Sequence, residues 1–351
     1  MDNKTFRELK DKGDYHVVRR FTDEYESYVS GLKSDRLREE RNWGMYSGVD
    51  YRQWDSAALE QLIQDGRPPT TFNFIQGYID NVMGQVKSNP YEVEFDNLSP
   101  AAFECGNLAQ ELWDRDYSIG RFEKEFSKAS LSSLIFKGVM QIYPDFSKGP
   151  TPIVGLREVN PLQFLYDPNL QTDNINDSRM VFRYGWFNPE QIKRENPRSA
   201  KEIEERLYNF DNLSYDRPID KLADRTSEYL NDLIGMYKVI EATWQEEIEV
   251  DKLFDKDTGE ELIDMAVPTM KALAKMNGSR YTQYSETASI TKILRFCPAL
   301  GMDVILAEGK YPFQIGRLPY FQTSAKNIHG QIQGLVDVIA DAQVVYNKRE
   351  S

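Results

Sequence analysis

Apolar residues in the first 140 positions recur at helical spacing, with polar residues between them. The stripes are Phe21, Tyr25 and Tyr28; Leu59, Leu62 and Ile63; Ile75, Ile79, Val82 and Val86; and Phe122, Phe126 and Ala129. Residues three or four apart share one face of a helix, so each stripe predicts an amphipathic helix. The last stripe runs into the apolar Leu134–Phe136, which predicts a helix at the centre of a core. Tyr91–Phe95 instead alternates polar and apolar residues and predicts a half-buried strand.

From Pro150 onward, the pattern changes to short apolar runs separated by turn residues such as Asn-Pro and Asp-Pro. Strands are predicted at Pro152–Leu156, Phe164–Tyr166, Met180–Phe187, Tyr237–Val250, Ile290–Phe296, Val304–Leu306 and Phe313–Ile315. Helices are predicted at Pro189–Asn209, Arg217–Gly235 and Pro268–Lys275. Asp257–Gly259 can turn the long strand back on itself. We therefore expect an α+β fold of compact domains.

The stretch from Gly330 reads as an amphipathic helix. Its apolar face would carry Ile332, Leu335, Ile339 and Ala342, in line with Ile328 and Tyr346, while Asp337, Asp341 and Lys348 would lie on the opposite side. No stop signal such as Gly or Pro follows Asn347, so the helix is expected to continue past Ser351 and the chain to be a fragment. On the pattern alone, the simplest interpretation is a core-packed apolar face and aspartates that face solvent.

Composition narrows the classes of protein. The 351 residues carry 43 basic and 56 acidic side chains, a net charge of −13, which disfavours a protein that holds nucleic acid by neutralising phosphates. The length allows two or three domains. Only Cys105 and Cys297 are present, far apart, so neither a disulfide framework nor a zinc site is expected. No apolar run approaches a membrane span and the N-terminus lacks a signal-peptide pattern, so cytosolic synthesis is expected.

Motifs for catalysis are missing from the sequence. There is no GxxxxGK[ST] phosphate loop and no HExxH or GxSxG motif, so we expect neither ATP hydrolysis, nor another enzymatic activity, nor a cofactor. The two histidines, His16 and His329, are poor candidates for a general base. Asp255, Asp257 and Glu261 invite a calcium-loop interpretation, but the following glycine stands one place early for an EF-hand. An exposed hairpin tip is the favoured interpretation.

Four blocks of sequence occur in a fixed order along the chain. They are Arg67–Asn73; Glu158–Pro161 with Asp167-Pro168 and Asp177–Arg179; Phe254–Glu260; and Gly334–Asp337 with Asp341, Gln343 and Asn347–Arg349. In this order they resemble the portal proteins of short-tailed double-stranded-DNA phages, which are head-to-tail connectors. The resemblance covers most of Arg67–Ser351.

The resemblance implies a protomer with a wing, a clip, a stem of tilted helices and a crown. It assigns residues 1–66 to the N-terminal helical region of the wing, 67–235 to a mixed α and β wing, 236–320 to an α/β clip and 321–351 to the truncated start of a stem helix. The C-terminal crown region would be absent from this chain.

The implied function is a dodecameric ring at the portal vertex of the virion, assembled in the host cytoplasm, through which double-stranded DNA is packaged and ejected. Asp337, Asp341 and Lys348 would face the channel, and Ile332, Leu335, Ile339 and Ala342 would pack against neighbouring helices. Asp255, Asp257, Glu260 and Glu261 would contact terminase or tail adaptors. The implied partners are further copies of the chain, double-stranded DNA, the terminase large subunit, major capsid and scaffolding proteins, and tail adaptor proteins, but no membrane.

Two other classes of protein stay open at this point. A metal-dependent nuclease could draw on the many carboxylates, although their spacing gives no two-metal constellation. Magnesium-dependent DNA cleavage that one carboxylate change abolishes would identify such an enzyme. Another virion structural protein, such as a ring adaptor, should lack the ordered wing, stem and clip blocks.

Overall fold

The computed structural model describes most of the chain. The residues outside the description are 1–2, 90–91, 96–102, 148, 150–151, 173, 198–199, 202, 206–229, 232–235, 256–260, 263–280, 302–303, 313–315, 329 and 351. In some segments, among them 249–253 and 281–286, only the backbone is described. The expected helix at Pro268–Lys275, most of Arg217–Gly235 and the expected strand at Phe313–Ile315 lie outside the described residues.

The chain divides into two compact units, each built from segments distant in sequence. Residues 1–20 and 187–318 form the first unit, and residues 21–186 and 319–351 form the second. This division falls at 186/187 and 318/319, whereas the sequence suggested boundaries at 66/67, 235/236 and 320/321. The assignment of those ranges to wing, clip and stem stays a prediction.

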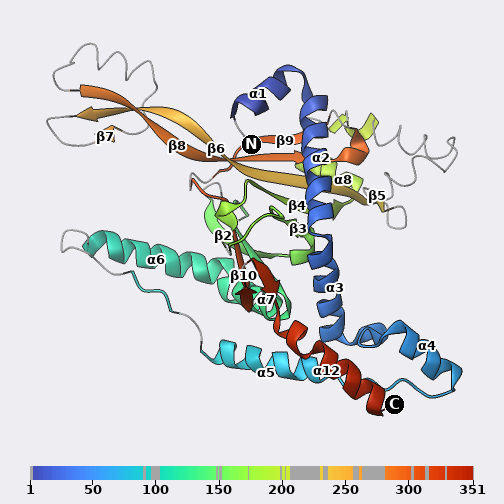
Figure 1. The fold of residues 1–351 in the computed structure, drawn as a ribbon. Helices are drawn as coiled ribbons and strands as arrows, with labels where there is room; N and C mark the ends of the chain where they lie inside the picture. The colour runs from blue at the N-terminus through green and yellow to red at the C-terminus, as the bar shows by residue number, and fades with distance from the viewer. Residues whose placement is uncertain are drawn as a thin grey trace. The chain divides into compact units, whose positions relative to one another are not determined.

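The first unit is built on long antiparallel strands (Figure 1). Strand β6 (Met236–Asp255) pairs with β8 (Tyr281–Phe296) from Ile240 opposite Phe296 to Asp255 opposite Tyr281. Strand β9 (Ile305–Lys310) continues the sheet beside β8, and the two-residue strands β5 (Leu230–Asn231) and β7 (Glu261–Leu262) pair with β6. The pairing of β7 confirms that the chain reverses direction between Asp255 and Glu261.

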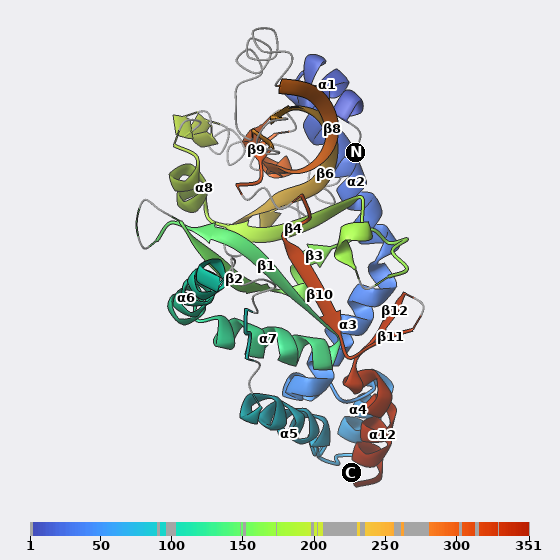
Figure 2. The ribbon, with the colours of Figure 1, turned by 90° about the vertical axis from the view of Figure 1, so that its left-hand side faces the viewer.

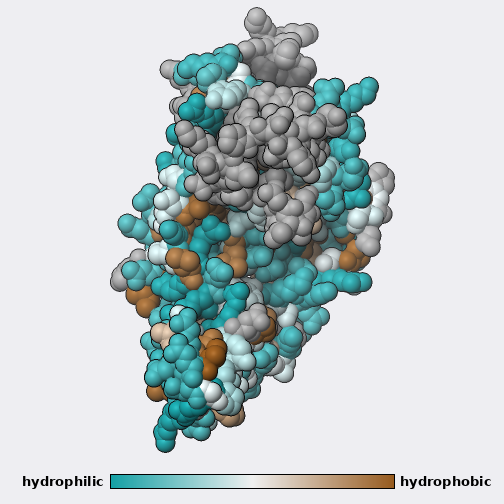
Figure 3. Space-filling model, turned by 90° about the vertical axis from the view of Figure 1, so that its right-hand side faces the viewer, coloured by the Kyte–Doolittle hydropathy of each residue, from teal (hydrophilic) through white to brown (hydrophobic). Residues whose placement is uncertain are grey.

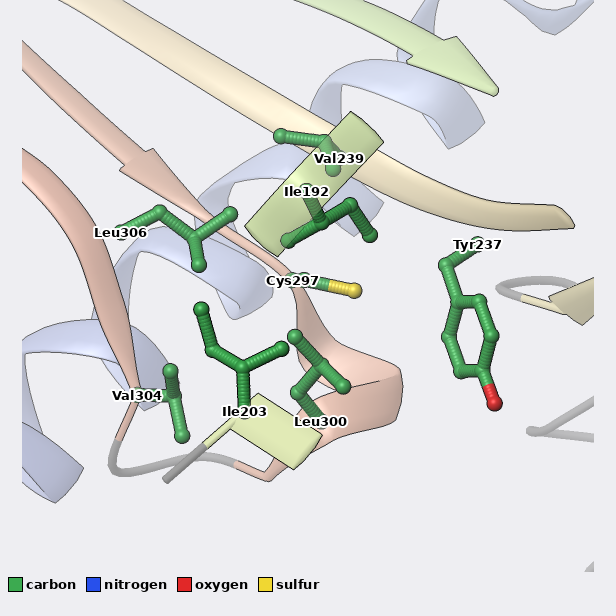
Figure 4. Close-up of a cluster of buried hydrophobic side chains, with 8 residues drawn as sticks. All are labelled: Ile192, Ile203, Tyr237, Val239, Cys297, Leu300, Val304 and Leu306. Carbon is green, nitrogen blue, oxygen red and sulfur yellow. The ribbon is translucent and has the colours of Figure 1, made fainter. Parts of the chain in front are cut away.

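Apolar side chains near one end of this sheet form the core of the first unit. Helix α8 (Pro189–Glu195) contributes Ile192 to this core. Asn188 caps the N-terminus of α8 through a reciprocal capping box. Figure 4 shows the cluster: Ile192, Ile203, Tyr237, Val239, Cys297, Leu300, Val304 and Leu306. Helix α1 (Asn3–Asp11) packs its Phe6 ring 5.4 Å from that of Trp244. Burial of these side chains removes apolar surface from water and stabilises the unit.

The second unit combines helices with a three-stranded antiparallel sheet. The sheet order is β10 (Tyr320–Ser324), β1 (Lys137–Asp145), β2 (Ile153–Val159). Smaller pairs are β3 (Phe164–Leu165) with β4 (Met180–Phe187) and β11 (Lys326–Ile328) with β12 (Gln331–Gln333). The helices are α2 (Asp14–Gly31, whose first residues belong to the other unit), α3 (Lys33–Ser47), α4 (Ser56–Gln64), α5 (Phe74–Ser88), α6 (Phe103–Gly120), α7 (Phe122–Ile135) and α12 (Leu335–Glu350).

Helix α7 is central to the second unit, as its sequence predicted. It packs on β1, β2 and β10 and also touches α3, α5 and α12 (Figure 2). The approach to β1 is close, because a Cβ at Gly138 would lie 2.2 Å from the carbonyl oxygen of Ala129. The structure thus confirms an α+β fold, and it also confirms the helical stripes of α2 and α5, whose Phe21, Tyr25 and Ile79 are buried.

One predicted strand is absent from the residues that the structure describes, and one predicted amphipathic helix forms without burying its apolar side. Glu92–Phe95, the described part of the expected strand, is irregular and exposed. The side-chain amide of Gln110 replaces a neighbouring strand, since it accepts from Phe95 N (3.0 Å) and donates to Val93 O (3.1 Å). Helix α4 forms as predicted but buries none of its residues.

The last helix starts later than predicted. Residues 331–333 form β12, and α12 begins at Leu335 after Gly330 takes a positive φ of 85°. In the described part of the chain, no helix is both long and apolar enough to cross a membrane. Of the coloured residues on the face in Figure 3, most are hydrophilic, and the hydrophobic ones form separate small patches.

Candidate channel, assembly and docking surfaces

Helix α12 buries a different face from the one its sequence suggested. The buried residues are Val336, Ala340, Gln343 and Asn347, whose 4-3-4 spacing defines one helical stripe. The predicted packing residues were Ile332, Leu335, Ile339 and Ala342. Ile332 is buried but belongs to β12, Leu335 and Ile339 are half-buried, and Ala342 is exposed. The face buried within the protomer therefore differs from the predicted stripe, because the pattern ranked two amides as polar and surface-facing. Packing of the predicted stripe against neighbouring copies stays a prediction.

Those two amides attach α12 to the segment that leads into α5. The Gln343 amide donates to Phe72 O and accepts from Phe74 N (3.1 Å). The Asn347 oxygen accepts from Phe72 N (3.2 Å) and from Gln343 (3.0 Å). A buried amide is tolerated only when its donors and acceptors are paired, so these contacts fix α12 in one position on the backbone of residues 72–74.

The amide network continues to the end of α3. The Asn347 amide donates to Gln53 (3.2 Å), and Gln53 donates to Asn73 (2.7 Å) and to Met45 O (2.6 Å). Asn73 in turn caps α5 by accepting from Gln76 N (3.0 Å). Four chain segments therefore meet at one polar cluster inside the second unit. No hydrophobic pattern could reveal this cluster, although the position of Asn73 before a helical stripe is the usual signal of a cap.

The two aspartates predicted to face a channel differ in their surroundings. Asp337 lies in the first turn of α12, its carboxylate accepts from Gly334 N (2.9 Å), and its side chain is 10% exposed. The nearest cation is Nε of Arg38, 3.9 Å away. Asp341, by contrast, is 96% exposed, with Nη2 of Arg41 at 3.4 Å. Asp337 therefore holds the start of the helix, while Asp341 presents its charge to solvent.

The third predicted channel residue, Lys348, is exposed and lies 3.6 Å from Asp55. Because α12 is seen here in a single copy of the chain, whether these residues face a channel stays a prediction.

Helix α3 is anchored to the sheet by a buried ion pair that the sequence did not suggest. Nζ of Lys137, the first residue of β1, lies 3.2 Å from Glu39, and both side chains are at most 1% exposed. Burial raises the pKa of Glu39, although the charge of Lys137 opposes the shift. The ammonium also lies 5.1 Å from the centre of the Tyr166 ring. The α7–β1 junction beside this pair is closely packed, because a Cβ at Gly334 would lie 1.9 Å from Ile135 O.

An exposed group of aromatic side chains surrounds the contact between α12 and α5. We call Phe72, Phe74, Tyr78 and Tyr346 the aromatic cluster. Their exposed fractions are 43%, 56%, 51% and 37%. The ring of Tyr346 stands edge-on to Phe74 (4.9 Å) and to Phe72 (5.9 Å), and Tyr78 follows one turn after Phe74 on α5. Large exposed aromatic groups of this kind mark interaction surfaces.

The predicted docking residues fall at the far end of β6 and its hairpin. Asp255 ends β6 and Glu261 begins β7, and only their backbones are described. Asp257 and Glu260 lie outside the described residues. Their role in docking therefore stays a prediction.

The described residues contain no group of three or more His, Cys, Asp or Glu side chains that could hold a metal ion. His16 is exposed beside Tyr15, with ring centres 5.5 Å apart, and His329 lies outside the description. Nothing in these surroundings orients His16 as a general base.

Comparison with known protein families shows to which family the chain belongs. A search of curated proteins finds no match. The family model described as "Phage P22-like portal protein" matches residues 19–351, which is nearly the whole sequence and includes both units of the fold. The chain therefore belongs to the phage P22-like portal protein family.

Proposed function

We propose that this chain is the protomer of a dodecameric head-to-tail connector, which packages and ejects double-stranded DNA at the portal vertex of the capsid. The observation that carries the proposal is the family match over residues 19–351, because portal proteins work as oligomeric rings with capsid and packaging partners. The role is structural rather than enzymatic. Assembly would take place in the host cytoplasm.

The exposed side of α12 is our candidate for the channel wall. Asp341 lies away from the buried stripe and projects its carboxylate into solvent. At physiological salt, electrostatic interactions are screened over about 8 Å, so such a carboxylate repels a phosphate only near contact. A wall of this kind keeps DNA from adhering while it slides. Asp337 would add to the same negative wall but also stabilises the helix start.

Docking of partners is assigned to the hairpin at the end of β6. Asp255, Asp257, Glu260 and Glu261 would present negative charge to the terminase large subunit during packaging and to tail adaptors afterwards. Capsid and scaffolding proteins would contact other surfaces of the ring. Residues 236–320 would then be the clip, and α12 the beginning of the stem.

Negative-stain images of the purified protein test this proposal. We expect rings with a central opening. A preparation that contains only isolated protomers over a wide range of concentration would contradict it. Mixing the same preparation with double-stranded DNA and magnesium is a control for nuclease activity, in which the DNA should stay intact.

A further inference from the structure

An apolar pocket opens between three helices of the second unit. Its volume is about 630 Å³. The C-terminal end of α5, the C-terminal half of α6 and residues 123–130 of α7 line it. The aromatic side chains on its walls are Trp113, Tyr117 and Phe126. Val93, from the segment that Gln110 holds, closes one side. Nothing in the amide network or in the channel surface uses this pocket.

The pocket and the aromatic cluster lie at opposite ends of α5. Phe74 begins this helix, whereas Val86 and Lys87 at its other end line the pocket. At 1.5 Å per residue, the rise along α5 from Phe74 to Lys87 is roughly 20 Å. Figures 1 and 2 agree with this placement, because α12 lies beside one end of α5 and α6 lies toward the other.

We propose that the aromatic cluster of one copy inserts into the α5–α6–α7 pocket of the next copy around the ring. This inference rests on the proposed function, since it requires a ring. A closed ring needs a head-to-tail interface, in which two different surfaces of the same chain meet. The second unit carries such a pair, one an exposed aromatic surface and the other an apolar pocket, at opposite ends of one helix.

The exposed area of the aromatic cluster supports this match. If an aromatic side chain offers about 200 Å², the exposed fractions of the cluster amount to roughly 370 Å². This is near half of the roughly 800 Å² that each partner buries in a stable interface, so the cluster would form the apolar centre and polar residues the rim.

Disulfide cross-linking tests the contact directly. Cys105, which is exposed on α6, is first replaced by Ser, and buried Cys297 is kept. In this background, the double variant Phe74→Cys/Lys124→Cys should form covalent ladders longer than a dimer upon oxidation of assembled rings. Each single variant should form no cross-link, because a head-to-tail interface does not bring a residue against itself. Dimers from either single variant would overturn the inference.

Assembly measurements give a second readout. Phe74→Ser, which removes the ring, and Ser127→Trp, which fills the pocket, should each raise the concentration needed for half-maximal assembly by about tenfold or more. Leu37→Ser on α3 is the matched control, because Leu37 is 59% exposed and lies outside both surfaces. This control should assemble as the unchanged protein does.

The outcomes separate this inference from the proposed function. If rings form but the double variant gives no ladder and both assembly variants behave like the control, the inference is overturned and the ring stands. If the unchanged protein forms no ring, the proposed function itself fails.

Discussion

Reversing the charge of Asp337 and that of Asp341 should have different consequences, although the sequence places both on one face of α12. Asp337→Lys removes the hydrogen bond to Gly334 N and a carboxylate at a helix N-terminus, and it places an ammonium near Arg38. Loss of such a cap costs about 1 kcal/mol, and the helix-dipole contribution about 0.3–1 kcal/mol. We expect a loss of about 2 kcal/mol in the free energy of unfolding. Asp341→Lys should change it by no more than about 0.5 kcal/mol, because an exposed ion pair contributes little.

Urea unfolding of the unassembled chain measures the difference in stability between the Asp337→Lys and Asp341→Lys variants. The second readout is retention of double-stranded DNA by assembled rings of Asp341→Lys, which adds two charge units per subunit. A plot of the logarithm of the DNA-binding constant against the logarithm of the salt concentration should become steeper by about 0.9 for each phosphate that a new lysine neutralises. This slope corresponds to roughly 3.5-fold weaker binding at 200 mM than at 50 mM salt. Leu37→Ser rings are the control.

Two results would refute this reasoning. Equal destabilisation by the two charge reversals would show that the capping hydrogen bond of Asp337 does not stabilise the helix start. DNA retention by Asp341→Lys rings equal to that of unchanged rings would place this residue away from the channel.

The remaining predictions concern buried polar contacts of the second unit. Lys137→Met removes the charge that opposes the burial-driven rise in the pKa of Glu39. Because a carboxyl with a raised pKa in the fold favours the unfolded state once it ionises, the variant should lose stability as the pH rises from about 5 to about 8. Urea unfolding at both pH values measures this, and no such loss would contradict the prediction. Burial acts to raise the pKa of Asp167, but its hydrogen bonds, first that from Arg179 (2.8 Å), outweigh it and lower the pKa. Ionised Asp167 therefore stabilises the fold until the pH falls through this lowered pKa, and Arg179→Ala should move acid unfolding, followed by circular dichroism, to higher pH. Gln343→Ala should cost about 2–3 kcal/mol, because it leaves backbone groups of residues 72 and 74 unpaired; a loss below about 1 kcal/mol would show that water replaces the amide.

The sequence predicted the elements whose burial follows from their own spacing. Met180–Phe187 forms a strand with the predicted bounds, β6 contains the predicted Tyr237–Val250, and α7 is the central helix. In each case the apolar residues of a single element are enough to show which side is buried.

Elements that depend on distant partners were missed. Strand β1 carries Lys137, Gln141 and Pro144, which do not alternate as a strand should, and it is stabilised by pairing with β10 almost two hundred positions later. Strand β12 was read as part of a helix because Ile332 fits its spacing, and its partner β11 was not predicted. Hydrophobic spacing does not record such long-range pairing.

The buried polar contacts were missed for a different reason. Glu39, Gln343 and Asn347 are residue types that usually face water, and each is buried only because a specific partner meets it in the fold. The channel and docking residues depend on further copies of the chain and on partner proteins.

The mass of the purified assembly tests the central claim most directly. Native mass spectrometry should show a closed oligomer, and a dodecamer of the 40.8 kDa chain would have a mass of about 490 kDa. The oligomer should persist on dilution and give a single stoichiometry. A spectrum that contains only the 40.8 kDa monomer at every concentration would contradict the assignment of this chain as a ring-forming portal protomer.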